Sequence, residues 1–516
     1  MFYSILFPTE DQYRQSRRET APDCFKDLYL DQIFQSILAD RKESKLESFF
    51  YTSLRDADTI IYRQTVLREL ENNDLRKLFS DFSQSIYRLS RYMENIKRSL
   101  VSKNSYENNY LTKGRLLDYA DRYCADIAGL MDKLRDRVLC SDGLRDFMEY
   151  LTAYTGTEAF TGLRGHISQL RRELSSVEYC MLIKNGAIRV RKYEGQEDHS
   201  KEVLRLFDKF RQGDVNDYGR KLSEEPAAQH VEAAVLNMVA SWYKDTFADM
   251  DDFCSKYLNF LDEILAQFSR EVQFYLSWLD YIQPQRAKGL PFCYPKMCND
   301  TEHLYDRDGF DLALASSIEG SGHPVTNDFV LDTPERIIVV TGPNQGGKTT
   351  FARAFGQIHY LSCLGLCVPG SEAALFLFDN ILTHFGREED LSTLNGKLQD
   401  DLERLHKLLG YATPQSIIII NEIFSSTTLK DALLLGNRMM DAVAKLGTPA
   451  VCVTFIDELA THGEETVSMM SSVLEDDPTV RTFKIIRKPP DGLAYAMHIA
   501  GKYELTYEQL CGRLRK

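Results

Sequence analysis

The chain has 516 residues, of which 43% are hydrophobic and 27% are charged. These proportions are typical of a soluble globular protein, and the length allows about two to four domains. The net charge of −14 argues against a protein that coats nucleic acid through bulk electrostatics. Any contact with nucleic acid would have to come from local basic patches.

Neither membrane insertion nor secretion is expected. No apolar run approaches the roughly 20 residues that a membrane helix needs, so no membrane partner is predicted. The opening MFYSILFP is followed at once by Glu10 and Asp11, which is unlike a secretory signal. Eleven cysteines are scattered singly without zinc-site spacing. An odd number without a disulfide framework favours reduced thiols and a cytoplasmic location.

The first half of the chain is predicted to be mainly helical, because apolar residues recur there at three- and four-residue intervals. One long helix is predicted across residues 247–282, and two others across residues 78–100 and 116–139. Asn185 and Gly186 separate two apolar runs, which predicts a β-hairpin near residues 181–193.

Basic residues gather at three places in this helical half. Arg189, Arg191 and Lys192 alternate with apolar residues in the predicted hairpin and are candidate DNA contacts. Two further clusters lie on predicted helices: Arg88, Arg91, Lys97 and Arg98, and Arg164, His166, Arg171 and Arg172. A solvated surface balanced by nearby acids is an equally open interpretation of each cluster.

The pattern changes near residue 285, where PQRAKGLPFCYP is rich in turn residues. Beyond it, the β-branched runs RIIVV, SIIII, AVCVTF and TFKII alternate with helical patterns, which predicts a parallel α/β sheet. We therefore predict a mixed fold, with a mainly α-helical region at residues 1–290 and an α/β P-loop domain at residues 291–516.

A phosphate-binding motif follows the first of these strands. In RIIVVTGPNQGGKTT, Gly342, Gly347, Lys348 and Thr349 satisfy G-x-x-x-x-G-K-[ST]. Glycines let backbone N–H groups surround phosphates, the lysine reaches the β- and γ-phosphates, and the threonine hydroxyl binds Mg²⁺. The predicted ligands are ATP and Mg²⁺, and the predicted nucleotide-binding residues are Gly342, Pro343, Asn344, Gln345, Gly346, Gly347, Lys348, Thr349 and Thr350.

The strand SIIII ends in Asn421 and Glu422. Glu422 is the candidate catalytic residue, because a carboxylate at this place can activate the attacking water. Thr349 and Asn421 are the candidate metal-binding residues, with Asn421 acting through a metal-bound water. An amide adds no negative charge beside the ion. The alternative is a buried strand that simply ends in polar residues.

Several segments of the second half resemble the MutS family. TGPNQGGKTT is similar to that family's phosphate loop, TGPNMGGKST, and IIIINEIFSSTTLKDA resembles its "LVLxDExGRGTSTxDG" segment. The resemblance covers roughly residues 320–512. It implies a helical core and lever followed by an ABC-type ATPase domain, through which two copies form a homodimer with composite nucleotide sites. It also implies DNA as a partner.

Three departures from the family pattern favour slow hydrolysis. Asn421 replaces the family's acidic residue, and Phe455 after Thr454 replaces its switch histidine. The serine that reaches the nucleotide of the other subunit falls on Gly396, and Ser392 could replace it only with a shifted register. Loss of one charge-stabilising group can lower a rate by about 10²–10³.

No segment comparable to the family's mismatch-reading domain precedes the core-like region, so conventional mismatch recognition is not expected. The resemblance implies an ATP-gated dimeric clamp on structured or branched DNA, acting in repair or recombination. The alternative is a nucleotide-gated module that binds a protein partner without DNA, which the acidic net charge favours.

Overall fold

The computed structural model describes residues 2–15, 18–39, 41, 45–101, 110–184, 187–196, 226–320, 322–386, 396–424, 426–474, 477, 480–490, 503 and 505–514. Contacts divide the chain into two compact units. We call them the sheet unit (Met1–Arg76, Leu139–Leu144 and Glu271–Lys516) and the helical unit (Lys77–Val138 and Arg145–Arg270). The first 76 residues thus belong with the strands. The predicted boundary between a helical region (residues 1–290) and a P-loop domain (residues 291–516) stays a prediction.

A six-stranded sheet forms the centre of the sheet unit. Its order is β10 (Ile381–Phe385), β11 (Ile417–Asn421), β12 (Ala450–Val453), β7 (Ile337–Thr341), β13 (Thr466–Val473) and β14 (Arg481–Arg487). The first five strands pair in parallel, so the prediction of a mixed fold with a parallel sheet is confirmed. The prediction is wrong for residues 482–486, because β14 runs antiparallel to β13. The connection 474–480 is too short for the crossover that a parallel strand requires.

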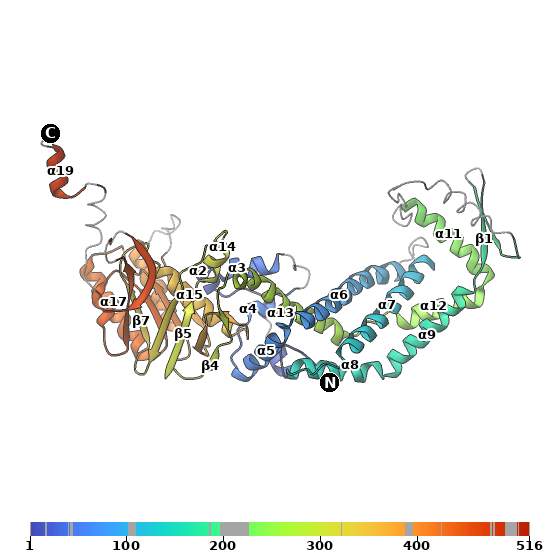
Figure 1. Cartoon of the computed structure of the whole chain (residues 1–516), viewed down its shortest axis with the longest axis horizontal. Coiled ribbons are helices and arrows are strands. Elements are labelled where there is room, and N and C mark those ends of the chain that lie inside the picture. Colours follow the sequence, from blue (N-terminus) through green and yellow to red (C-terminus); the bar gives the residue numbers. More distant parts are fainter. Residues whose placement is uncertain are drawn as a thin grey trace. The chain divides into compact units, whose positions relative to one another are not determined.

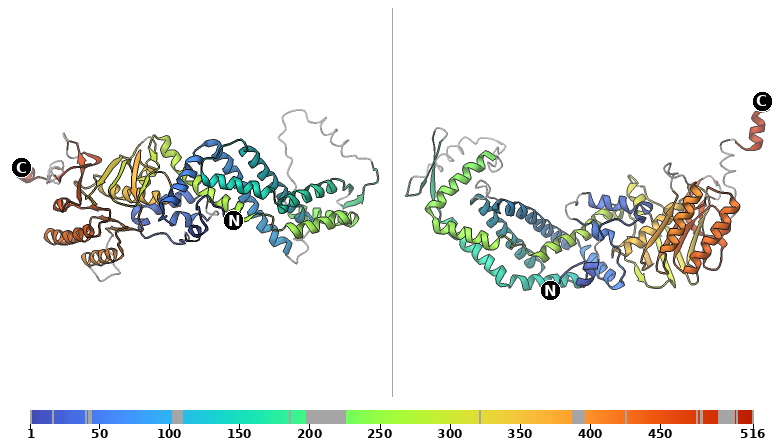
Figure 2. Two further views of the ribbon diagram at one scale, coloured as in Figure 1. Left: turned by 90° about the horizontal axis from the view of Figure 1, so that it is seen from below. Right: turned by 180° about the vertical axis from the view of Figure 1, so that it is seen from behind.

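Helices cover both faces of this sheet (Figures 1 and 2). Ile418 and Ile420 of β11 pack into one core cluster with Met439 of α17 (Leu429–Leu446) and with residues of α16 (Lys397–Tyr411). Ile419 points to the other face, where a Cβ on Gly356 of α15 (Lys348–Ser362) would lie 2.7 Å from its side chain. Because alternate residues of a strand face opposite ways, the isoleucine run is a strand buried on both sides.

The remaining elements of the sheet unit are smaller sheets and helices. Smaller sheets are formed by β4 (Lys296–Cys298), β9 (Glu372–Phe376), β5 (His303–Gly309) and β6 (Asn327–Asp332), and by β3 (Phe292–Cys293) and β8 (Val368–Pro369). The other helices are α1 (Glu10–Gln15), α2 (Cys24–Leu28), α3 (Leu30–Leu38), α4 (Glu47–Tyr51), α5 (Ala57–Leu70), α14 (Leu312–Ser317), η3 (Asp457–Thr461) and α19 (Tyr507–Leu514).

The N-terminal helices complete the core around α15. Arg63 of α5 is wholly buried, and its guanidinium donates to the carbonyls of Leu6 and Leu364, each at 3.0 Å. Burial lowers the pKa of Arg63 to about 10. The Tyr360 hydroxyl of α15 donates to the carbonyl of Phe50 at 2.9 Å. The last turns of α15 are therefore buried by residues from the start of the chain.

The helical unit contains all or part of seven helices among its described residues. They are α6 (Asn73–Val101), α7 (Tyr110–Leu134), α8 (Asp142–Thr155), α9 (Glu158–Ser175), α11 (Pro226–Trp242), α12 (Lys244–Tyr257) and α13 (Glu263–Ala287). Long helices α6 and α7 occupy most of the predicted ranges 78–100 and 116–139, but α7 ends at Leu134, so the predicted end at residue 139 is wrong. Among the described residues, none of the helices is both long enough and apolar enough to cross a bilayer.

The single helix predicted across residues 247–282 is wrong, because the chain breaks between α12 and α13. The Asp262 carboxylate accepts from the N–H of Leu265 at 3.0 Å and caps α13. The N–H of Asp262 donates to the Tyr123 hydroxyl at 3.2 Å. An aspartate cap therefore starts a second helix within a continuous apolar pattern.

Strands β1 (Tyr179–Lys184) and β2 (Ala187–Lys192) form an antiparallel hairpin beside α11 (Figure 1). Val190 of β2 is buried in a small core with Val235 and Val239 of α11. The predicted turn at Asn185 and Gly186 lies outside the described residues.

Candidate functional site

A glycine-containing loop at residues 342–347 connects β7 to α15. Gly342 and Gly347 have φ values of 105° and 92°, which glycine adopts without strain. A Cβ on Gly342 would lie 3.0–3.2 Å from three atoms of Ser471 in β13. The close approach of β13 and the left-handed backbone therefore both require glycine here, and they fix the path of the loop.

Lys348, the first residue of α15, folds back over this loop. Its ammonium donates to the carbonyls of Gly342 and Pro343 at 2.8 and 3.1 Å, and to Oδ1 of Asn344 at 3.3 Å. Burial lowers the pKa of Lys348, and the negative charge of Glu422 opposes that shift. The Lys348 ammonium is therefore bound by neutral oxygen acceptors. Phosphate oxygens are stronger acceptors and can replace them.

Asn421 and Glu422 lie beside Lys348 at the end of β11. The Thr349 hydroxyl donates to Oδ1 of Asn421 at 3.0 Å, and Asn421 is buried. Glu422 is exposed, has a φ of 54° and donates its N–H to the carbonyl of Val453 at 2.9 Å. The structure thus brings the predicted lysine, threonine, amide and carboxylate together.

Three of these residues, Lys348, Thr349 and Glu422, line a pocket of about 490 Å³. Six of the predicted nucleotide-binding residues line it: Gln345, Gly346, Gly347, Lys348, Thr349 and Thr350. Glu422 also lines it, whereas Gly342, Pro343 and Asn344 accept hydrogen bonds from Lys348 instead. Part of the pocket wall is therefore polar and carries one ammonium and one carboxylate.

The rest of the pocket wall is mainly apolar and was missed by sequence reasoning. It consists of Leu314, Ile318, His323, Pro324, Val325, Asn327 and Phe483. Phe483 is 49% exposed and has a φ of 59°, a strained conformation for an aromatic residue. Asn327 holds it by donating to the Phe483 carbonyl at 3.3 Å and accepting from the N–H of Ile485 at 2.7 Å.

Two further polar residues brace the loop from strands distant in sequence. The buried Ser471 hydroxyl donates to the carbonyl of Gly346 at 2.7 Å. Arg481 of β14 donates to the carbonyl of Asn344 at 3.3 Å. Neither residue belongs to a motif, so the sequence carries no signal for their role.

The structure places most of the residues at which this chain departs from the family pattern. Thr454 is buried, and its hydroxyl accepts from the N–H of Ile456 at 3.1 Å, whereas Phe455 is 47% exposed. Gly396 is exposed and forms the N-cap of α16 without a side-chain hydrogen bond. Ser392 lies outside the described residues.

The hairpin's basic residues divide between its two faces. Arg191 is opposite Cys180 and Arg189 is opposite Leu182 across the strand pair, and both arginines are exposed. They lie on the face opposite the buried Val190. Lys192 lies on the Val190 face, with its ammonium 5.3 Å from the Tyr243 ring centroid. The outward face therefore presents two arginines.

The predicted cluster around His166 is largely balanced by acids. The Arg171 guanidinium pairs with Asp118 and, at 3.3 Å, with Asp121. The His166 imidazole lies 3.0 Å from Asp249. These pairings favour the solvated-surface interpretation over a basic patch.

Residues 338–507 match the family model of MutS domain V. The DNA mismatch repair protein MutS of Lactobacillus helveticus is 25% identical over 262 residues, covering 50% of this chain and 30% of that protein. MutS of Staphylococcus haemolyticus is 31% identical over 214 residues, covering 39% and 24%. Endonuclease MutS2 of Thermus thermophilus is 28% identical over 188 residues, covering 36% and 25%. The chain thus spans less than a third of the length of these relatives.

Proposed function

Since the chain belongs to the MutS family through its domain V, we propose that it binds and slowly hydrolyses ATP with Mg²⁺ and acts on DNA as an ATP-gated dimeric clamp. The observation that carries this proposal is the convergence of Lys348, Thr349 and Glu422 on one pocket. The relatives are named as DNA mismatch repair proteins and as an endonuclease, which supports a role in DNA repair or recombination.

The polar part of the pocket wall suits a triphosphate, and the apolar part suits a base. Lys348 would exchange its loop carbonyls for β- and γ-phosphate oxygens, while the N–H groups of residues 345–349 surround the phosphates. The exposed ring of Phe483 offers a flat apolar surface on which a purine can stack. The pocket volume of about 490 Å³ lies within the usual range for small-molecule sites.

The residues beside the pocket fit a magnesium ion. Thr349 and Asn421 present neutral oxygens 3.0 Å apart, and Mg²⁺ prefers oxygen ligands and retains several waters. Thr349 would contact the ion directly and Asn421 would hold one of its waters. The bound ion would neutralise charge on the phosphates. Because Asn421 is uncharged, this chain supplies less negative charge to the ion than a carboxylate would.

Glu422 would orient and deprotonate the attacking water, since it is the carboxylate on the pocket wall. Phe455 cannot donate a hydrogen bond to the γ-phosphate, as a histidine could. The amide at Asn421 and the phenyl ring at Phe455 each remove a group that would stabilise the transition state. Their presence therefore favours ATP binding and dimer closure over rapid turnover.

The DNA component of the proposal rests on the outward face of the hairpin. Arg189 and Arg191 are exposed there, and guanidinium groups bind phosphates in a sequence-independent way. Two such groups suit a clamp that holds the duplex by its backbone.

The nucleotide component is tested with Lys348→Ala and, as a matched control, Lys445→Ala on the exposed last turn of α17. Removal of the partly buried ammonium should cost about 2–5 kcal/mol of binding free energy, which is at least about 30-fold in affinity for a fluorescent ATP analogue. The control should bind as the unmodified chain does. Equal binding by Lys348→Ala would refute the site.

The DNA component is tested by gel shift with branched and linear duplexes over a range of salt concentrations. Joint substitution Arg189→Ala and Arg191→Ala should lower the slope of log affinity against log salt by about 2. Joint substitution of Arg122 and Arg135, which are exposed and pair with Asp126 and Asp132, should not change it. Absence of binding to any DNA at low salt, with and without ATP, would refute the DNA clamp. It would favour the alternative, a nucleotide-gated module that binds a protein partner.

A further inference from the structure

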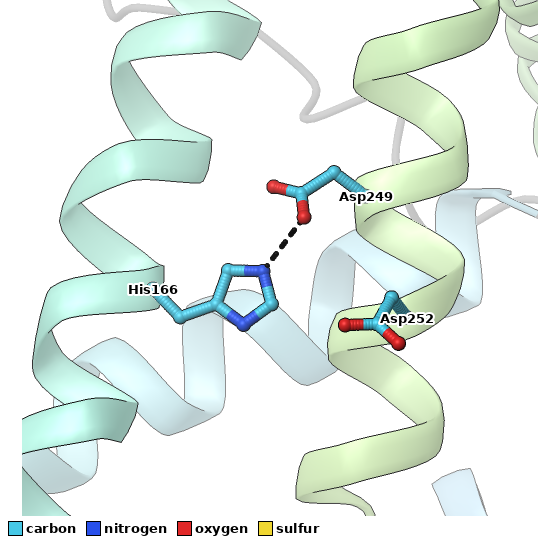
Figure 3. A group of neighbouring side chains, drawn as sticks. All are labelled: His166, Asp249 and Asp252. Carbon is cyan, nitrogen blue, oxygen red and sulfur yellow. Dashed lines mark hydrogen bonds and ion pairs between the residues drawn. The ribbon is translucent and has the colours of Figure 1, made fainter.

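One cluster in the helical unit takes no part in the nucleotide pocket or the hairpin. His166 projects from α9, and Asp249 and Asp252 project from α12 (Figure 3). The two aspartates are three positions apart, a spacing that places side chains on the same side of a helix. Both carboxylates can therefore approach the same imidazole.

The three side chains are already close to a common centre. Nε2 of His166 lies 3.0 Å from Oδ1 of Asp249. One potential ligand atom from each of the three residues lies within 4.8 Å of the others. The rings of Phe253 and Tyr257 pack at 5.2 and 5.6 Å from the imidazole, centroid to centroid, and restrict its orientation.

The cluster carries negative charge that the described side chains do not neutralise. Oδ2 of Asp249 is buried, and none of the described residues donates a hydrogen bond to it. Within the described part of the chain, neither Asp249 nor Asp252 forms an ion pair with lysine or arginine. The neighbouring Asp251, in contrast, pairs with Lys113 at 2.7 Å. A buried carboxylate oxygen without a partner destabilises the fold, and a cation would remove that penalty.

We propose that His166, Asp249 and Asp252 bind one divalent transition-metal ion, which cross-links α9 and α12. One imidazole with two carboxylates suits Zn²⁺, Co²⁺ or Mn²⁺, whereas Mg²⁺ and Ca²⁺ prefer oxygen ligands alone. Metal–ligand distances of about 2.0–2.2 Å place ligand atoms about 3.5 Å apart. The exposed Asp252 can make that adjustment by a change of rotamer, and water would complete the coordination shell.

The test uses the full chain, freed of metal by dialysis and kept without nucleotide, so that the proposed magnesium site has no phosphates to support it. Titration with Co²⁺ should fill one site per chain and give the weak visible bands of nitrogen and oxygen ligation. The strong near-ultraviolet band of thiolate ligation should be absent, which excludes the cysteines.

The informative variant is Asp252→Asn, which weakens one ligand and leaves the hydrogen bond between His166 and Asp249 intact. It should lower Co²⁺ affinity at least about tenfold and abolish the rise in melting temperature that Co²⁺ produces. Asp245→Asn, at an exposed position of the same helix, should behave as the unmodified chain. His166→Gln should also lose the visible bands, with far-ultraviolet circular dichroism confirming its fold. No bound Co²⁺, a thiolate band, or equal affinity in Asp252→Asn and Asp245→Asn would overturn the proposal.

Discussion

The substitution Asn421→Asp tests whether the amide at the end of β11 limits magnesium binding. The new side chain has the same shape and keeps an acceptor for the Thr349 hydroxyl, which lies 3.0 Å away. It adds one negative charge next to the proposed ion. We therefore expect tighter magnesium binding without a change of fold.

The expected magnitude follows from the geometry. Mg²⁺ binds oxygen at about 2.0–2.1 Å, so an ion on Thr349 would lie within about 5 Å of the carboxylate at position 421. Coulomb's law then gives about 1.7 kcal/mol for a divalent ion even at the dielectric constant of bulk water, which is more than tenfold in affinity. Repulsion between the new carboxylate and Glu422 offsets part of this gain. We expect the Mg²⁺ concentration for half-maximal activity to fall about tenfold.

The assay is steady-state ATP hydrolysis over a range of Mg²⁺ concentrations at constant ionic strength. Asn380→Asp is the matched control, because Asn380 is an exposed amide that does not line the nucleotide pocket. The control should leave the Mg²⁺ dependence unchanged. If Asn421→Asp and Asn380→Asp have the same Mg²⁺ dependence, residue 421 does not act on the ion and the reasoning fails.

Three further predictions concern catalysis and stability. Glu422→Gln should lower the single-turnover rate of ATP hydrolysis by about 10²–10³ while ATP affinity is retained; an undiminished rate would reassign the water-activating group. Arg63→Leu leaves two buried carbonyls without their donor and should lower the free energy of unfolding in urea by about 2–5 kcal/mol. The control Arg14→Leu, at an exposed ion pair, should change the free energy of unfolding by less than about 1 kcal/mol. Equal losses of unfolding free energy in the two variants would contradict the role of Arg63. Burial lowers the pKa of His359 to about 4, so the unfolded chain takes up that proton first as the pH falls below about 6.5. The stability present at pH 7.5 should then decline by about 2 kcal/mol at pH 5, and His359→Leu should lack this part of the decline in urea titrations at the two pH values.

The parts of the site that were predictable are those that are contiguous in sequence. Residues Gly342 to Thr349 form a recognisable motif because a single turn must supply all the phosphate contacts. Strand β11 is recognisable because both of its faces are buried, which requires a continuous apolar run. Ser471, Arg481 and Phe483 reach the same loop through strand pairing. Strand pairing is a tertiary event and leaves no local spacing in the sequence.

The predictions of one helix boundary and of one strand direction were wrong for a related reason. The apolar periodicity continues through Asp262, so the cap that starts α13 is hidden within a pattern that otherwise predicts one helix. The run at residues 482–486 predicts a strand, but its direction depends on the short connection that precedes it. Local propensity therefore indicates the type of an element more reliably than its ends or its partners.

The burial of α15 by the first helices has a consequence for how the protein is made. Arg63 and Phe50 leave the ribosome early, but their partners Leu364 and Tyr360 follow about 300 residues later. At synthesis rates of about 5–20 residues per second, that interval is about 15–60 s. During that time the side chains of this segment that contact α15, such as Phe25 against Tyr360, have no native partner there, although α2, α3 and α4 can pack on one another. We therefore expect the N-terminal segment to need a chaperone during translation.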